Sequence, residues 1–148
     1  DGAGNVIEPE LLYRPYRLQT AAGDLSIVFR DHRLSDLIGF TYGSMPPKRA
    51  AADLVGHLEA IAQKLKQHQS SGSSSLEQPW LVTIALDGEN CWEYYPQDGK
   101  PFLENLYQTL SNHPHIKLVT VSEFLDAFPP TATIPGEKLH SGSWVDGS

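Results

Sequence analysis

The sequence predicts an α/β protein built around a parallel sheet, and three observations lead to that prediction. Apolar, β-branched runs at 24–31, 80–87 and 116–121 are typical of strands. Between them, residues 47–68 and 99–113 repeat apolar side chains every three or four positions, as amphipathic helices do. Strands that alternate with helices favour right-handed crossovers and a parallel sheet. Three strands are few for a closed barrel, but they fit a sector of one.

The composition bounds the domain count and the class of partner. A chain of 148 residues predicts one domain, 1–148, large enough to bury a core. The net charge of −7 argues against nucleic acid and against an anionic membrane surface, since both require a basic face. No apolar run approaches the roughly 20 residues that span a bilayer. The single cysteine, Cys91, cannot form an internal disulfide, so we expect a reducing, cytoplasmic location.

The first half of the chain offers weaker signals on either side of its one clear strand. Residues 1–23 are polar and irregular, and they predict no strand. The stretch 32–45 is too short for a regular helix and too mixed for a clean strand. Ser44 is expected to cap the first helix, with Pro46 and Pro47 in the first turn.

The second half begins with a flexible loop, SSGSSS at 70–75. The run 80–87 is apolar nearly throughout, so we expect it to be covered on both faces. Ser122 is expected to cap a short helix that a Pro-Pro pair ends, and 131–148 is expected to be a loop. Neither terminus closes a fold, so we expect a piece of a longer protein.

Two predicted strands end in charged residues, where parallel α/β folds place their sites. Arg30 and Asp31 close one strand and Asp87 closes another, followed by Gly88, which permits a sharp turn. A carboxylate at the mouth of a buried strand is partly desolvated, which raises its pKa and suits a general acid. The alternative is that Asp87 caps the following loop or pairs with an arginine.

Other kinds of site are less well supported, and we expect neither a metal nor a cofactor. Only His32 and His140 lie where they could join carboxylates as metal ligands. The sequence has no Gly-x-Ser-x-Gly elbow and no glycine-rich phosphate loop. Cys91 has no evident basic partner, which favours a small buried thiol over a nucleophile.

Aromatic residues in predicted loops suggest carbohydrate, because flat rings stack on the C–H faces of sugars while acids bind hydroxyls. Trp92 and Trp144 lie in such loops. Packing explains Trp92 equally well, and it is the favoured explanation for Tyr94 and Tyr95.

Four segments resemble glycoside hydrolase family 57, the α-amylase and amylopullulanase family. TIALDGENCWEYY (83–95) is similar to its fourth signature region, and LHSGSW (139–144) resembles its fifth. FRDHRLSDLIGFTY (29–42) looks like the stretch upstream of the fourth region, and VTVSEFLDAFPP (119–130) fits the connecting segment. The resemblance runs in the correct order from residue 12 to the C-terminus.

The resemblance implies a partially closed (β/α)7 barrel, a relative of the TIM barrel, and hydrolysis of α-glucan with retention of configuration. Retention requires a nucleophile and an acid/base carboxylate. Asp87 occupies the acid/base position, whereas the nucleophilic Glu belongs to a third region that has no match here. The chain is therefore expected to be a barrel sector that is inactive alone. Its cut edges and uncovered apolar surface are expected to promote self-association.

The resemblance also suggests residues that contact substrate. Arg30 and Asp31 would hold a sugar hydroxyl or orient the nucleophile, with an Arg30–Asp36 or Arg30–Glu89 ion pair as the structural alternative. The expected substrate-binding residues are Arg30, Asp31, Glu89, Trp92, His140 and Trp144. The alternatives to a hydrolase are a non-catalytic carbohydrate-binding domain and an α-glucan transferase or branching enzyme of the same family.

Overall fold

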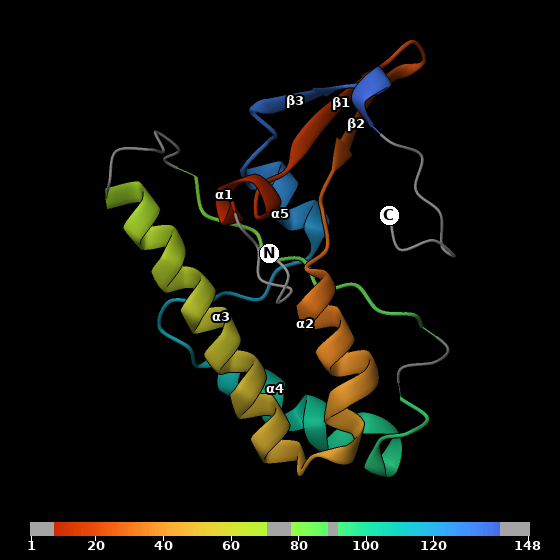
Figure 1. Ribbon diagram of the computed structural model, residues 1–148, viewed down its shortest axis with the longest axis vertical. Coiled ribbons are helices and arrows are strands. Elements are labelled where there is room, and N and C mark those ends of the chain that lie inside the picture. Colours follow the sequence, from red (N-terminus) through yellow and green to blue (C-terminus); the bar gives the residue numbers. More distant parts are fainter. Residues whose placement is uncertain (1–7, 71–77, 89–91, 140–148) are drawn as a thin grey trace.

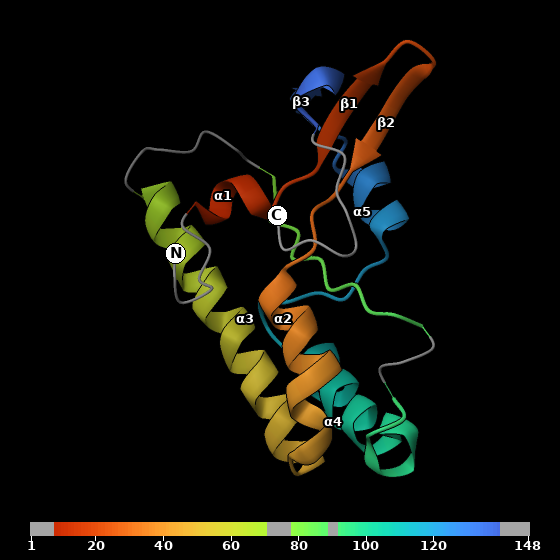
Figure 2. The ribbon, with the colours of Figure 1, turned by 45° about the vertical axis from the view of Figure 1, so that its right-hand side comes forward.

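The structure is a computed structural model that describes residues 8–70, 78–88 and 92–139. A small sheet with two short helices lies at one end of the molecule, and the longer helices gather at the other (Figure 1). The same division is seen in the rotated view of Figure 2. Extended segments of the chain connect the two ends. No helix in the described ranges is long and apolar enough to cross a membrane.

Both long helices form where the apolar periodicity predicts them. They are α3, Pro47–Ser70, and α4, Lys100–Ser111. The stretch 32–44, for which no regular helix was predicted, is helical throughout but irregular. It consists of α2, His32–Asp36, then a π-helical turn, Leu37–Thr41, and a 3-10 turn, Tyr42–Ser44.

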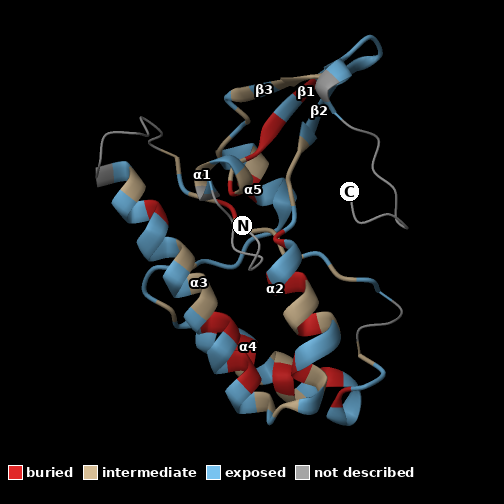
Figure 3. Cartoon of the chain, viewed as in Figure 1, coloured by how far each residue is buried: buried red, intermediate tan, exposed pale blue. Residues whose placement is uncertain are grey.

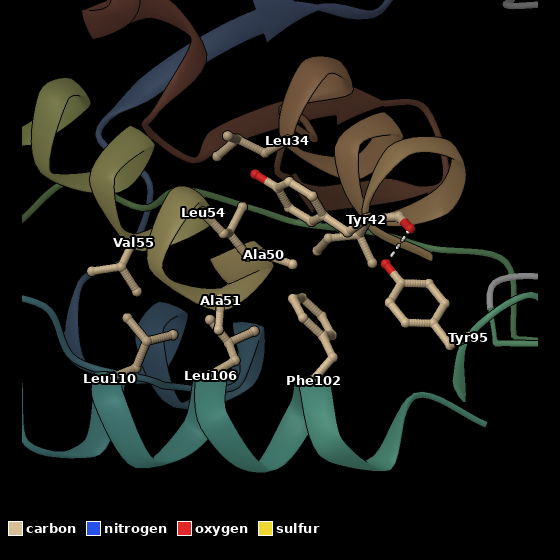
Figure 4. Packing of buried hydrophobic residues seen from close by; sticks show 11 residues of the cluster. Leu34, Tyr42, Ala50, Ala51, Leu54, Val55, Tyr95, Phe102, Leu106 and Leu110 are labelled. Atoms are coloured by element: carbon tan, nitrogen blue, oxygen red, sulfur yellow. Dashed lines mark hydrogen bonds between the residues drawn. The ribbon is translucent and has the colours of Figure 1, made fainter. Parts of the chain in front are cut away.

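The principal core lies where these three helical stretches meet, and the buried residues in Figure 3 concentrate there. Leu54 of α3 and Phe102 of α4 are almost completely buried, and Tyr42 packs on the Phe102 ring with centroids 5.9 Å apart (Figure 4). Because the apolar residues of α3 and α4 recur at helical spacing, they form continuous stripes that pack together. The cluster comprises Leu34, Ile38, Tyr42, Ala50, Ala51, Leu54, Val55, Tyr95, Phe102, Leu106 and Leu110.

The sheet has three strands in the order β2-β1-β3. They are β1, Tyr16–Thr20, β2, Gly23–Ile27, and β3, Ala132–Pro135. β1 pairs antiparallel with β2 and parallel with β3, so the sheet is mixed. Tyr16 and Leu18 of β1 are buried while the residues between and after them are exposed, the alternation expected of a strand with one covered face.

The predicted all-parallel sheet of three strands is therefore wrong, as is its β-α-β order. Residues 24–27 do form a strand, but its partner β1 lies in the segment predicted to be irregular, and β3 lies in the predicted loop. The run 80–87 is extended but makes only one parallel bridge, between Thr83 and Arg30. Residues 116–121 form no strand. Composition alone predicted strands in runs that find no continuous partner among the described residues.

The short helices begin differently from the prediction. α5, Val121–Ala127, is capped by Thr120 rather than Ser122, with a reciprocal capping box between Thr120 and Glu123. Ser44 does not cap α3, because α3 begins at Pro47 and the first helical amides bond to the Pro46 carbonyl. The Ser44 hydroxyl instead donates to the Thr41 carbonyl at 3.1 Å. Of the predicted loop, residue 70 ends α3 and 71–75 lie outside the described residues. The remaining short elements are α1, Pro9–Leu12, and the 3-10 turns Pro96–Gly99 and Gly136–Lys138.

Candidate functional site

Asp87 lies near the end of the extended segment 78–88, and its side chain is exposed. Gly88 follows in a turn, with no heavy atom within 4 Å of the place where a Cβ would sit. The predicted partial desolvation of Asp87 is wrong for this chain, since no described element covers this end of the segment. The carboxylate is accessible to a ligand.

The segment that leads to Asp87 is held by the chain around residues 30–35. Asp31 donates its backbone N–H to the Thr83 carbonyl at 2.7 Å. The Ala85 N–H donates to Ser35 Oγ at 3.3 Å, and Arg30 Nη1 donates to the Ala85 carbonyl at 3.5 Å. The ends of two runs predicted as strands therefore do lie side by side, as the parallel arrangement required.

Asp31 is a buried helix cap rather than an open sugar ligand. Asp31 is only 3% exposed. Its Oδ1 accepts a hydrogen bond from the Leu34 N–H at 2.9 Å, at the start of α2. Oδ2 accepts from the Tyr13 hydroxyl at 2.5 Å. Burial, together with this hydrogen bond, raises the pKa of Tyr13 above its ordinary value. A sugar hydroxyl could reach Asp31 only by displacing these contacts.

Arg30 is exposed, and its Nη1 bonds to the Ala85 carbonyl, two residues before Asp87. The alternative Arg30–Asp36 ion pair does not form, because Asp36 Oδ2 lies 3.0 Å from His32 Nδ1 instead. The other predicted partner of Arg30, Glu89, lies outside the described residues.

Trp92 packs into the molecule rather than presenting a flat platform. Its ring meets Tyr95 edge-on at a centroid distance of 5.3 Å. Gly99 adopts a positive φ of 78°, and a Cβ there would lie 2.5 Å from Trp92 Cε3, so the contact requires glycine. Tyr95 is buried and its hydroxyl donates to the Ile38 carbonyl at 2.6 Å (Figure 4), which confirms its packing role.

Two exposed aromatic residues flank a depression that the sequence did not predict. Phe40 is 87% exposed and Tyr94 is 82% exposed, so the packing role predicted for Tyr94 is wrong. The depression measures about 400 Å³ and is lined by Gly39, Phe40, Gly43, Ser44, Glu93, Tyr94 and Tyr95. Gly39 and Gly43 were the available sequence signal, because they interrupt the apolar helical face. A Cβ at Gly39 would meet no heavy atom within 4 Å, whereas one at Gly43 would lie 3.3 Å from the Tyr94 carbonyl oxygen, so Gly43 permits the close approach of that segment.

Three of the predicted site residues, Glu89, His140 and Trp144, lie outside the described residues, as does Cys91. Within the described ranges no three His, Cys, Asp or Glu side chains gather as metal ligands would. The residues that the sequence missed are Tyr13, which bonds to Asp31, and Ser35, which bonds to the segment leading to Asp87. Ser35 stands four positions after Asp31, one helical turn away, and that spacing was the only hint.

Comparison with known proteins gives a family match and a similar solved structure. Residues 1–136 match the model of glycosyl hydrolase family 57. The fold is similar to the crystal structure of 4-alpha-glucanotransferase from Thermococcus litoralis, with a TM-score of 0.58 and 21% identity. That alignment covers 90% of this chain but 18% of the other, so the chain spans under one fifth of its length. No curated protein matches the sequence.

Proposed function

The chain belongs to glycosyl hydrolase family 57, and we propose that it is the part of an α-glucan-processing enzyme that supplies the acid/base carboxylate, Asp87. The observation that carries this proposal is the family match over residues 1–136, which includes the whole DGEN-containing turn. The exposed position of Asp87 at the end of an anchored extended segment supports it.

We infer that the active enzyme is longer and that the chain is a sector of its (β/α)7 barrel. The small share of the Thermococcus litoralis protein that the chain covers supports this inference. So do Trp80 Nε1 and Thr83 Oγ1, which are buried yet make no hydrogen bond within the described residues. Such atoms normally have partners. Neighbouring strands of a complete barrel would enclose the 80–87 segment and provide partners of this kind.

The proposed mechanism is a double displacement with retention. Asp87 protonates the leaving glycosidic oxygen while a Glu from the rest of the enzyme attacks the anomeric carbon. The resulting Asp87 carboxylate then accepts a proton from the water that releases the sugar. The two carboxyl groups must lie roughly 5–5.5 Å apart. Because this chain supplies only one of them, it is expected to be inactive alone.

Substrate contacts in the complete enzyme follow from the same proposal. We propose that Arg30 holds a sugar hydroxyl, which its bond to the Ala85 carbonyl beside Asp87 supports, whereas Asp31 acts through its contacts with the backbone. Glu89, His140 and Trp144 remain predicted contacts, and Trp92 would contribute at most one edge of its packed ring. A cytoplasmic location also remains a prediction.

Replacing Asp87 by Asn in the full-length enzyme tests the proposal. The change preserves shape but removes the proton, so kcat on a maltooligosaccharide should fall about 10²–10⁴-fold while binding survives. Asp126→Asn, at an exposed position on α5, is the matched control and should leave kcat unchanged. Near-normal kcat in the Asp87→Asn enzyme would refute the assignment.

Transfer is the first alternative reaction, because the similar solved structure is named as a 4-alpha-glucanotransferase. Hydrolysis and transfer share the first displacement and differ in whether water or a sugar hydroxyl completes the second. Analysis of products from a single maltooligosaccharide separates them. Longer products than the starting chain indicate transfer.

A non-catalytic carbohydrate-binding role is favoured by one observation, the depression between the exposed rings of Phe40 and Tyr94. Glu93 lines it and could accept hydrogen bonds from sugar hydroxyls. Titration of the chain with maltooligosaccharides, compared with its Tyr94→Ala variant, measures this directly. Tight binding by the chain, together with full activity of an Asp87→Asn enzyme, would favour binding over catalysis.

A further inference from the structure

We propose that Ser35 and Asp31 are positioning residues for Asp87: they fix the backbone at Thr83 and Ala85 and thereby set where the Asp87 carboxylate is presented. This inference rests on the proposed function, which assigns the acid/base role to Asp87. It goes further by giving a role in catalysis to side chains that do not touch substrate.

The contacts converge on a short part of the extended segment. The Asp31 N–H donates to the Thr83 carbonyl at 2.7 Å, and Ser35 Oγ accepts from the Ala85 N–H at 3.3 Å. Arg30 adds a longer bond from Nη1 to the Ala85 carbonyl at 3.5 Å. Three hydrogen bonds therefore hold the chain two and four residues before Asp87.

The anchor itself is buried and internally bonded. Ser35 is 2% exposed, and its hydroxyl donates to the Asp31 carbonyl at 2.7 Å while accepting from Ala85. The hydroxyl therefore donates its one proton to a carbonyl at the start of α2 and accepts a hydrogen bond from the extended segment. Asp31 is fixed in turn by the Leu34 N–H and the Tyr13 hydroxyl. These bonds hold Asp31 at the start of α2, from which its N–H and Ser35 Oγ reach the segment.

The position of Asp87 depends strongly on this anchor. An extended chain advances about 3.3 Å per residue, so Asp87 Cα lies roughly 7 Å beyond Ala85. Gly88, on the other side, has no heavy atom within 4 Å of the place where a Cβ would sit, so no packing contact at that place adds a matching restraint. A shift at Ala85 would move the carboxylate by a comparable amount, and a misplacement of about 1 Å can lower a rate about 10²-fold.

A purely structural network makes a different prediction from a positioning network. If the hydrogen bonds only stabilise the fold, their loss lowers the melting temperature but leaves kcat per folded molecule unchanged. If they position Asp87, their loss lowers kcat at temperatures where the enzyme is fully folded. KM should change little, because ground-state binding does not use the Asp87 proton.

The test uses the full-length enzyme with Ser35→Ala, assayed on a maltooligosaccharide well below its melting temperature. We expect kcat to fall about 10–100-fold with KM changed less than about threefold. Ser35→Thr, which keeps the hydroxyl, should restore at least half of the lost rate on a logarithmic scale. Thr109→Ala is the matched control, because Thr109 also donates to its i−4 carbonyl, at Asn105, but at an exposed position of α4. It should leave kcat unchanged.

A kcat of Ser35→Ala within twofold of the parent's would overturn the inference. Asp87→Asn is measured in parallel, and if that variant keeps near-normal kcat the proposed function fails whatever Ser35 does. If Ser35→Ala does not fold, Tyr13→Phe decides, since it removes only the hydroxyl that holds Asp31 Oδ2. A several-fold fall in kcat at constant KM supports the inference, and an unchanged kcat overturns it.

Discussion

The helices and the extended segments of this chain differ in how far their apolar side chains are buried and their polar groups are hydrogen-bonded. Around α3 and α4, apolar side chains from three helical stretches form one buried cluster. Along 80–87 and 116–121, the chain has strand-like composition but finds little pairing among the described residues. Trp80 Nε1 lacks a partner there within the described residues, and Leu118 is 46% exposed.

The difference reflects where each kind of structure finds its hydrogen bonds. A helix satisfies its backbone within the segment, so local sequence decides whether it forms. A strand needs a partner from elsewhere in the chain. We propose that segments 80–87 and 116–121 are strands of a larger barrel. Their neighbouring strands would then belong to the rest of the enzyme, which explains why the two segments lack continuous partners among the described residues.

The largest expected effect breaks the helical core. Phe102→Ala removes a ring that packs against Tyr42 and Tyr95 and is 1% exposed. The free energy of unfolding should fall by about 3–5 kcal/mol, measured by chemical denaturation. Tyr107→Ala, on the same helix but 53% exposed, should change it by less than about 0.5 kcal/mol. Equal losses for the two variants would mean that α4 does not pack as described.

The next effect is a pH dependence of stability that arises from two buried tyrosines, each of which donates a hydrogen bond to a carboxylate. Burial and a hydrogen bond to Asp53 raise the pKa of Tyr42, and burial and a hydrogen bond to Asp31 raise the pKa of Tyr13. Because the native pKa lies above that of the unfolded chain, this stability is complete below about pH 10 and is lost as the pH rises further. The free energy of unfolding, measured from pH 8 to 11, should fall with pH.

Tyr42→Phe supplies the control for this pH dependence. It removes the hydroxyl that donates to Asp53 Oδ2 at 2.7 Å, so stability at pH 8 should fall by about 1–2 kcal/mol. The decline above pH 10 should become shallower. An unchanged alkaline slope would indicate that other groups dominate the titration.

A smaller effect is expected at α5, which begins at the last residue of the 116–121 segment. Thr120→Ala removes the cap that accepts the Glu123 N–H, and stability should fall by about 1 kcal/mol. Hydrogen bonds from Thr120 lower the pKa of Glu123. Their stabilisation is present above the pKa of the unfolded carboxyl and is lost as the pH falls through the native value. Thr120→Ala should therefore weaken the acid dependence in denaturation curves, whereas Ser122→Ala should not.

The smallest effect on stability is expected in the 116–121 segment itself. Leu118→Ser, at an exposed side chain, should change the free energy of unfolding by less than about 0.5 kcal/mol. It should nevertheless reduce self-association of the chain, because exposed apolar surface promotes it. Sedimentation over a wide concentration range measures this. A parent chain that stays monomeric throughout would contradict the expected self-association.

The sequence predicted the helices better than it predicted the strands and their pairing. The stripes containing Leu54 and Leu106 predicted both long helices, because periodicity is a local property. The pairing of β1 with β3 was not predictable, since it joins residues more than a hundred positions apart with weak alternation. The Asp87 turn was predicted, but its exposure was not, because exposure depends on what else covers the segment. Ser35 was missed since its role appears only once α2 lies against Ala85.

The most direct test of the acid role of Asp87 compares leaving groups in the full-length Asp87→Asn enzyme. A sugar leaving group needs protonation, whereas fluoride leaves without it, so only the former depends on a general acid. We expect the first displacement to slow at least about 10²-fold with a maltooligosaccharide but less than about tenfold with the corresponding α-glycosyl fluoride. Equal losses with both substrates would contradict the assignment of Asp87 as the acid/base residue.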